Sequence, residues 1–157
     1  MNDNYLNIYN NLIKLTRNKL LYEKICNQDS FSDRFTIFLF HFAFFLKVYK
    51  GSVSKSNMQE IYDFVFKQVE LSIREIGYGD STINKKMKDY INNFYSIIDK
   101  VELWDTIEND EKSLIFSKYF DISPKSEFFV NYFEKYQTFL INNTLNHFTK
   151  DVISFKF

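Results

Sequence analysis

The densest cluster of residues that could do chemistry lies between residues 74 and 88. Two of the three glycines in the chain fall in its turn, Gly77-Tyr78-Gly79, which is flanked by Arg74 and Asp80. Glycine there permits a positive φ and lets another backbone approach closely. Three lysines follow in the next segment, namely Lys85, Lys86 and Lys88. This charged corner indicates a surface that binds a partner, and a helix–turn–helix corner with a solvated lysine face is the structural alternative.

The three lysines are unfavourably placed for the helix that we expect after this turn. Cations in the first turns of a helix oppose its dipole, at a cost of ~0.3–1 kcal/mol each when they are exposed. Asp80 offsets part of that cost. A local rule that is broken without visible compensation suggests a function.

Residue types that bind metals or catalyse reactions do not cluster in the sequence. His41 and His147 have no neighbouring cysteine or histidine at ligand spacing, and Cys26 is the only cysteine. There is no Gly-x-Ser-x-Gly elbow, phosphate loop or His-Glu-x-x-His, and the two-glycine turn lacks the third glycine of a dinucleotide fingerprint. We therefore expect no enzyme, no metal and no cofactor. We expect His41 to be hydrogen-bonded in the core and His147 to lie at the surface.

Composition and charge limit the classes of partner and the cellular compartment that we expect for this protein. The formal net charge is zero, which argues against direct nucleic-acid binding, because counterion release needs a basic excess. The single cysteine fits a reducing compartment, and the first residues lack the features of a signal or transit peptide, which predicts a cytoplasmic protein. Aromatic residues make up 20% of the chain. Their occurrence with abundant Asn, Lys and Ile favours codon bias in an AT-rich genome over selection for aromatic side chains.

Long stretches with helical periodicity must position these residues. Residues 35–49 are apolar nearly all round and are too few to cross a bilayer, which takes ~20 residues, so helix 32–50 is expected to be buried at the centre. We predict an all-α, single-domain bundle over residues 1–157, with about six to seven helices around that central helix. Capping boxes are expected at Ser30 with Asp33 and at Ser56 with Gln59. The other helices are expected at residues 4–26 (one bent or two short), 56–76 (ended by Gly77 or Gly79), about 80–101, 110–120 and 126–150.

Around the charged corner the chain resembles the ubiquinol–cytochrome c chaperone family. The similarity is carried by residues 71–80, by the three following lysines and by Phe94-Tyr95. Upstream, Asp33-Arg34-Phe35 with His41 six residues later resembles the other recognisable stretch of the family, so the similarity spans roughly residues 5–104. The chain departs from the family pattern at Ser96-Ile97, where Gly-Arg is usual. A bacterial member, from an AT-rich alphaproteobacterium, is expected.

The resemblance implies an assembly chaperone that binds newly made cytochrome b, or another bc1 subunit, during biogenesis of the cytochrome bc1 complex. It implies no reaction, a small partner protein or the ribosome as further partners, and at most peripheral association with the inner membrane. A helical bundle would hold such a client in an apolar groove edged by charge. The residues assigned to client or partner binding are Arg34, Arg74, Gly77, Gly79, Asp80, Lys85, Lys86 and Lys88.

Two other functions compete with this one. The chain could be a generic helical adaptor for another protein, with the resemblance preserved only as fold. It could also be a small enzyme or ligand-binding bundle, for which a deep closed pocket with buried ionisable groups would argue. An open apolar groove beside the charged corner would favour the chaperone.

Overall fold

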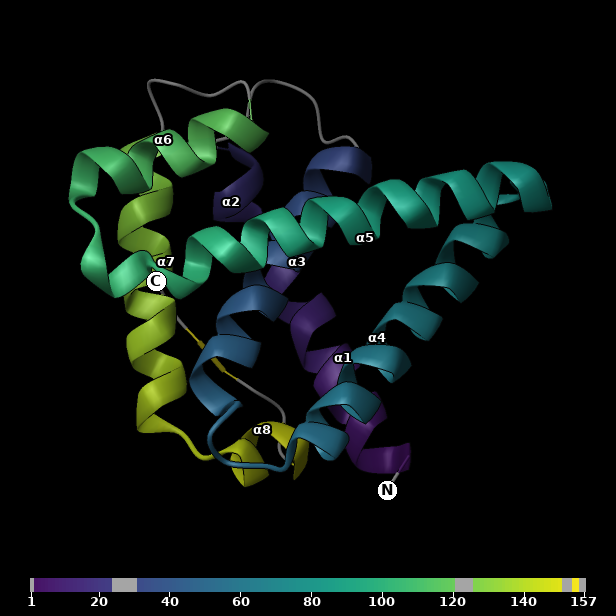
Figure 1. The fold of residues 1–157 in the computed structure, drawn as a ribbon, viewed down its shortest axis with the longest axis horizontal. Coiled ribbons are helices and arrows are strands. Elements are labelled where there is room, and N and C mark those ends of the chain that lie inside the picture. Colours follow the sequence, from purple (N-terminus) through teal and green to yellow (C-terminus); the bar gives the residue numbers. More distant parts are fainter. Residues whose placement is uncertain (1, 24–30, 121–125, 151–153, 156–157) are drawn as a thin grey trace.

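The part of the chain described by the computed structural model is helical and contains no strand (Figure 1). That part comprises residues 2–23, 31–120, 126–150 and 154–155. The described residues form eight α-helices, six of them with seven or more residues, which pack into one helical body as the sequence predicts. In chain order the elements are α1 (Asn2–Thr16), α2 (Lys19–Glu23), α3 (Phe31–Tyr49), α4 (Lys55–Ile76), α5 (Asp80–Glu102), a 3-10 turn (Trp104–Thr106), α6 (Asn109–Tyr119), α7 (Ser126–Asn142) and α8 (Leu145–Lys150).

Helix α3 is the buried centre of the bundle, as its all-round apolar sequence predicts. It packs against α1, α5 and α7, and Figure 1 shows α5 crossing in front of it. Residues 37–45 are at most 2% exposed, His41 among them. A helix of this composition has no polar face to offer solvent, so it is stable only when neighbours cover every side.

Aromatic rings from the surrounding helices cover α3 on two sides. On one side Phe42 meets Phe66 of α4 at 6.2 Å and Phe94 of α5 at 5.2 Å. On the other side Phe44 meets Trp104 at 5.1 Å and Phe133 of α7 at 5.2 Å. The high aromatic content therefore fills the core, because large rings bury much area per residue.

Helices α4 and α5 form a hairpin whose turn projects at the right-hand side of Figure 1. The α4 helix begins after Ser54, whose side chain accepts a hydrogen bond from the backbone N–H of Asn57 at 3.1 Å. The expected capping box at Ser56 is therefore wrong by two residues. Gly77 ends α4 at φ 102°, a left-handed conformation that glycine adopts without strain.

The C-terminal part differs from the expected single helix over residues 126–150. It is split into α7 and α8, and Tyr49 of α3 donates its hydroxyl hydrogen towards the carbonyls of Leu140 and Asn143 at the break, at 2.9 and 2.8 Å. The Leu140 carbonyl also accepts from the backbone N–H of Asn143 at 3.2 Å, so the tyrosine adds a donor at this helix end, where carbonyls run out of intrahelical partners. Phe155 packs on α7, with its ring 5.2 Å from that of Phe139.

The expected N-terminal helix is two helices, α1 and α2, which is one of the two predicted arrangements. Cys26 and the proposed cap at Ser30 lie outside the described residues. Within the described ranges, no helix combines the length and the apolar character needed to cross a bilayer.

Candidate binding surface at the α4–α5 corner and a neighbouring pocket

The α4–α5 corner holds seven of the eight residues that the sequence assigns to partner binding. The backbone N–H of Gly77 donates to the carbonyl of Arg74 at 3.0 Å, which closes the last turn of α4. Gly79 then stands in extended conformation, at φ −72°, before α5 begins at Asp80. All four of these residues are exposed. The corner is therefore formed by helix-end geometry and lies open to a partner.

Arg74 and Asp80 are partners of each other at this corner. The guanidinium Nη1 of Arg74 lies 2.6 Å from Oδ1 of Asp80, and Nη2 lies 3.4 Å from Oε1 of Glu70. The hydrogen bond to Asp80, with that to Glu70, raises the pKa of Arg74 above its ordinary value. The hydrogen bond from Lys67, with that from Arg74, lowers the pKa of Glu70. Arg74 and Asp80 thus tie the end of α4 to the start of α5 while both stay exposed, and their role in binding a partner stays a prediction.

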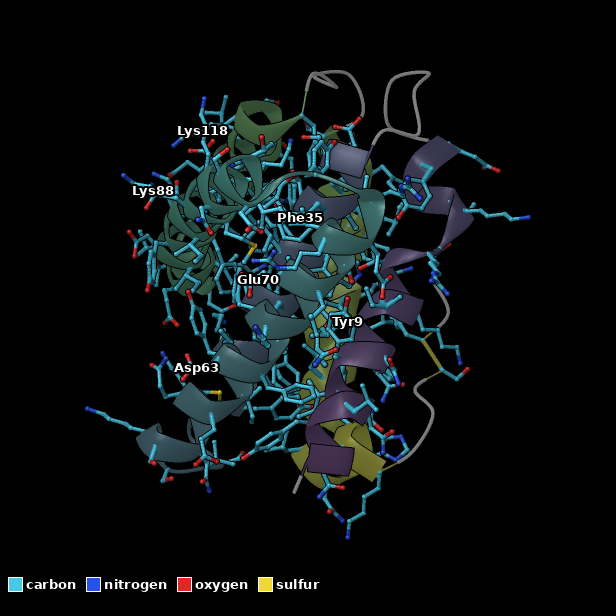
Figure 2. All side chains as sticks on the ribbon, turned by 90° about the vertical axis from the view of Figure 1, so that its right-hand side faces the viewer. Tyr9, Phe35, Asp63, Glu70, Lys88 and Lys118 are labelled. Carbon is cyan, nitrogen blue, oxygen red and sulfur yellow. The ribbon has the colours of Figure 1, made fainter. Side chains whose placement is uncertain are left out.

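The three lysines follow on α5 in two environments. Lys85 and Lys88 are exposed, and Figure 2 shows Lys88 at the outer edge of the molecule. Lys86 is half-buried, with its Nζ 4.7 Å from the centre of the Tyr78 ring, a cation–π contact. Because α5 begins at Asp80, all three lie beyond its first turn, where the dipole effect falls off. The helix-dipole argument for a functional role of the lysines is therefore weakened, and the exposure of Lys85 and Lys88 becomes the stronger reason.

The eighth assigned residue, Arg34, lies in a different feature, a pocket of about 200 Å³ between α1, α2, α3 and α4. Phe35 and Phe38 of α3 and Val69 of α4 are buried side chains of its lining. Among the described residues, the lining consists of Tyr9, Ile13, Thr16, Arg17, Tyr22, Arg34, Phe35, Phe38, Val69 and Ser72. Figure 2 faces this side of the molecule, with Tyr9 and Phe35 labelled.

The hydroxyl groups that line this pocket hydrogen-bond within the protein. The hydroxyls of Tyr9 and Ser72 lie 3.2 Å apart and bridge α1 to α4. Thr16 donates to the carbonyl of Leu12 at 2.8 Å, and Tyr22 donates to the carbonyl of Thr16. The described part of the lining therefore offers apolar surface to an occupant, and the charged side chains in that part are the two exposed arginines, Arg17 and Arg34.

Sequence reasoning found Arg34 but missed the rest of this pocket. Its walls come from four helices, so Tyr9, Ile13 and Arg17 of the N-terminal region meet Val69 and Ser72 only after folding. No spacing within one segment marks them. Each apolar member resembles an ordinary core residue of its own helix.

His41 is held by hydrogen bonds in the core. Its Nδ1–H donates to the carbonyl of Ile37 at 2.8 Å, so its Nε2 accepts from the hydroxyl of Tyr132 at 2.7 Å. Burial lowers the pKa of His41 from 6.5 to about 4, which keeps the ring neutral. Both ring nitrogens are occupied, as the sequence predicts. His147 is partly exposed.

Comparison with known proteins gives one family. The sequence model of the ubiquinol–cytochrome c chaperone family matches residues 23–104, more than half of the chain. That segment contains α3, α4 and α5, and with them all eight assigned residues. Neither the curated proteins nor the solved structures gave a match. Among the described residues no group of three or more His, Cys, Asp or Glu side chains is arranged to hold a metal ion. This protein belongs to the ubiquinol–cytochrome c chaperone family.

Proposed function

We propose that this protein is an assembly chaperone that binds newly made cytochrome b and assists biogenesis of the cytochrome bc1 complex, without catalysing a reaction. The observation that carries the proposal is the family match over residues 23–104. Membership of this family suggests a role in bc1 assembly, and the choice of cytochrome b as client is the further step that we propose.

The shape of the α4–α5 corner supports a protein client. It projects from the bundle, and it carries Lys85 and Lys88 on its outside beside two partly exposed apolar side chains, Ile76 at 52% and Tyr78 at 42%. Apolar side chains edged by charge suit a client that presents both apolar helices and charged loops. The Arg74–Asp80 pair would hold this corner in one conformation, so less ordering remains to be done on binding.

The experiment reverses the two exposed lysines, Lys85→Glu with Lys88→Glu, in cells of the organism that encodes the protein. We expect co-purification of cytochrome b to fall about fivefold, a range consistent with the loss of exposed charge contacts, and assembled bc1 complex to decline with it. Binding of the unmodified protein should weaken as salt rises, because exposed charges are screened. The free energy of unfolding should change by about 0.5 kcal/mol or less, as at most exposed sites.

The matched control reverses two exposed lysines elsewhere, Lys118→Glu of α6 with Lys150→Glu of α8. It changes the net charge equally and should leave co-purification unchanged. If cytochrome b does not co-purify with the unmodified protein while another soluble protein does, the chain is an adaptor and the proposal is wrong. If the Lys85 and Lys88 variant unfolds while its folded fraction still binds normally, these lysines are structural.

A further inference from the structure

The pocket between α1, α2, α3 and α4 has the size of one large side chain. Its volume is about 200 Å³. A dry cavity of ~150 Å³ accommodates benzene, so this pocket accommodates one aromatic or branched aliphatic side chain. A long acyl chain would exceed it.

The lining favours an aromatic occupant without a polar group. Four aromatic residues contribute to it, and the Tyr9 and Phe38 rings already meet edge to face at 5.9 Å. Rings in this arrangement attract a further ring through their quadrupoles. Because the lining hydroxyls of Tyr9, Thr16, Tyr22 and Ser72 are already hydrogen-bonded, the hydroxyl of an inserted tyrosine would find few partners. Phenylalanine therefore fits better than tyrosine.

The charged residues at the pocket favour an acidic neighbour to that ring. Arg17 follows the last turn of α1 and Arg34 lies in the first turns of α3, and both are exposed. No acidic side chain is among the described residues that line the pocket. Both arginines line the pocket, so a carboxylate placed there would be attracted by two positive charges. A guanidinium carries five N–H donors, so an existing contact leaves donors for a carboxylate.

We infer that this pocket is an anchor site for a partner protein, which inserts one phenylalanine side chain flanked by an aspartate or glutamate. The apolar floor receives the ring, and Arg17 and Arg34 bind the carboxylate. The inference rests on the proposed function only in taking the occupant to be part of a protein. Anchors of this type, with one aromatic side chain in a pocket, dominate the affinity of many interfaces.

The test titrates the purified full-length protein with three peptides, acetyl-Asp-Phe-Asp-amide, its neutral isostere acetyl-Asn-Phe-Asn-amide and acetyl-Asp-Ala-Asp-amide, which lacks the ring. The methyl resonances of Ile13 and Val69 report the site, because an inserted ring shifts nearby methyl groups. We expect the acidic phenylalanine peptide to bind about fivefold or more tightly than the neutral one, the effect of two exposed charge contacts. The alanine peptide should leave both methyl groups unshifted.

Two variants and one control locate the binding. Arg17→Gln with Arg34→Gln should reduce the affinity for the acidic peptide to that for the neutral peptide. Lys118→Gln with Lys150→Gln changes the net charge equally and should have no effect. Ile13→Phe fills the pocket and should abolish binding of both phenylalanine peptides. The arginine variants change only exposed side chains, so they decide the question even if the filled variant does not fold.

Equal affinity for the acidic and neutral peptides would overturn the inference, as would shifts that spare Ile13 and Val69. Dodecanoate is titrated in a separate arm, and if it binds in the pocket while the peptides do not, the occupant is a fatty acid and the inference is wrong. Failure with these peptides while cytochrome b still co-purifies would remove the anchor site and leave the proposed function. Peptide binding without cytochrome b co-purification would remove the proposed client and keep the site.

Discussion

His41 shows how one polar residue is tolerated in the middle of an apolar helix. Its two nitrogens are satisfied by Ile37 and Tyr132, and Tyr136 donates to its backbone carbonyl at 3.1 Å. This arrangement requires the neutral ring, because protonation would give Nε2 a hydrogen where it now accepts one. The residue is therefore fixed in one protonation state by its partners and by burial.

Because the folded protein keeps His41 neutral, its free energy of unfolding depends on pH. The pKa of His41 is lowered by burial from 6.5 to about 4 in the folded protein. Between these values the unfolded chain takes up a proton that the folded protein excludes, so stability falls as pH falls from about 6.5 to about 4. At ~1.4 kcal/mol per pH unit the loss approaches ~3 kcal/mol at pH 4.

The measurement is urea unfolding of the protein and of His41→Gln from pH 7 to pH 4. The carboxylates of Asp and Glu also titrate in this window, but they do so equally in the unmodified protein and in the variant. The stability advantage of the unmodified protein should therefore shrink by ~3 kcal/mol across the range. An advantage that stays constant would show that His41 is not the group responsible.

The start of α4 offers a test at the scale of one helix. Ser54 accepts from the N–H of Asn57 at 3.1 Å, whereas Ser56, the cap expected from the sequence, lies inside the first turn. Ser54→Ala should lower the free energy of unfolding by about 0.5–2 kcal/mol through loss of the cap. Ser56→Ala should change it by less than about 0.5 kcal/mol, because that side chain is exposed. Equal effects at the two sites would contradict the observed cap.

The glycines at the other end of α4 give a second matched pair. Gly77 has φ 102° and Gly79 has φ −72° in the capping position of α5. Gly77→Ser should destabilise by about 1–2 kcal/mol, because a side chain strains the left-handed conformation. Gly79→Ser should be neutral or stabilising by a few tenths of a kcal/mol, because serine is a better N-cap than glycine. Thermal unfolding of both variants distinguishes the two positions.

The sequence pattern predicts one helix over residues 126–150, but the structure has two, α7 and α8. No glycine or proline marks the break, and the apolar spacing continues through it. The chain breaks there where the hydroxyl of Tyr49, from a distant helix, supplies hydrogen bonds to the last carbonyls. Tyr49 is too far away in sequence to leave a local signal, whereas Thr144, whose hydroxyl accepts from the backbone N–H of His147 at 3.1 Å, marks the start of α8 locally.

At the scale of the whole molecule, the fold is predicted best where the sequence of one segment alone determines its structure. Residues 35–49 predict a buried central helix because no polar face exists to be solvated. The two glycines, Gly77 and Gly79, predict the end of α4 to within two residues, and Gly77 is the one with the left-handed conformation. The pocket could not be predicted, because Tyr9, Arg17 and Val69 become neighbours only through tertiary packing. The Arg74–Asp80 pair was not predicted for a different reason, because its partners meet across a turn and not at the spacing of one helix face.

The aromatic core should determine global stability. Phe44 is fully buried against Trp104, Phe133 and Tyr136, at centroid distances of 5.1, 5.2 and 6.3 Å. Phe44→Ala should cost about 3–5 kcal/mol, from lost burial and the cavity left behind. Leu114→Ala, at a side chain that is 68% exposed, should stay within about 0.5 kcal/mol. Similar melting temperatures for the two variants would contradict the central role of this cluster.

Trp104 is the only tryptophan in the chain, and it is fully buried where the 3-10 turn meets α3 and α6. Lys112 lies over its ring, with Nζ 4.9 Å from the ring centre. Tryptophan fluorescence should therefore come from Trp104 alone. Its emission maximum should lie at short wavelength and move to longer wavelength when water reaches the indole. The single tryptophan of the chain therefore reports on the junction of three elements. Each stability measurement above can thus be read from intrinsic emission, without attaching a dye.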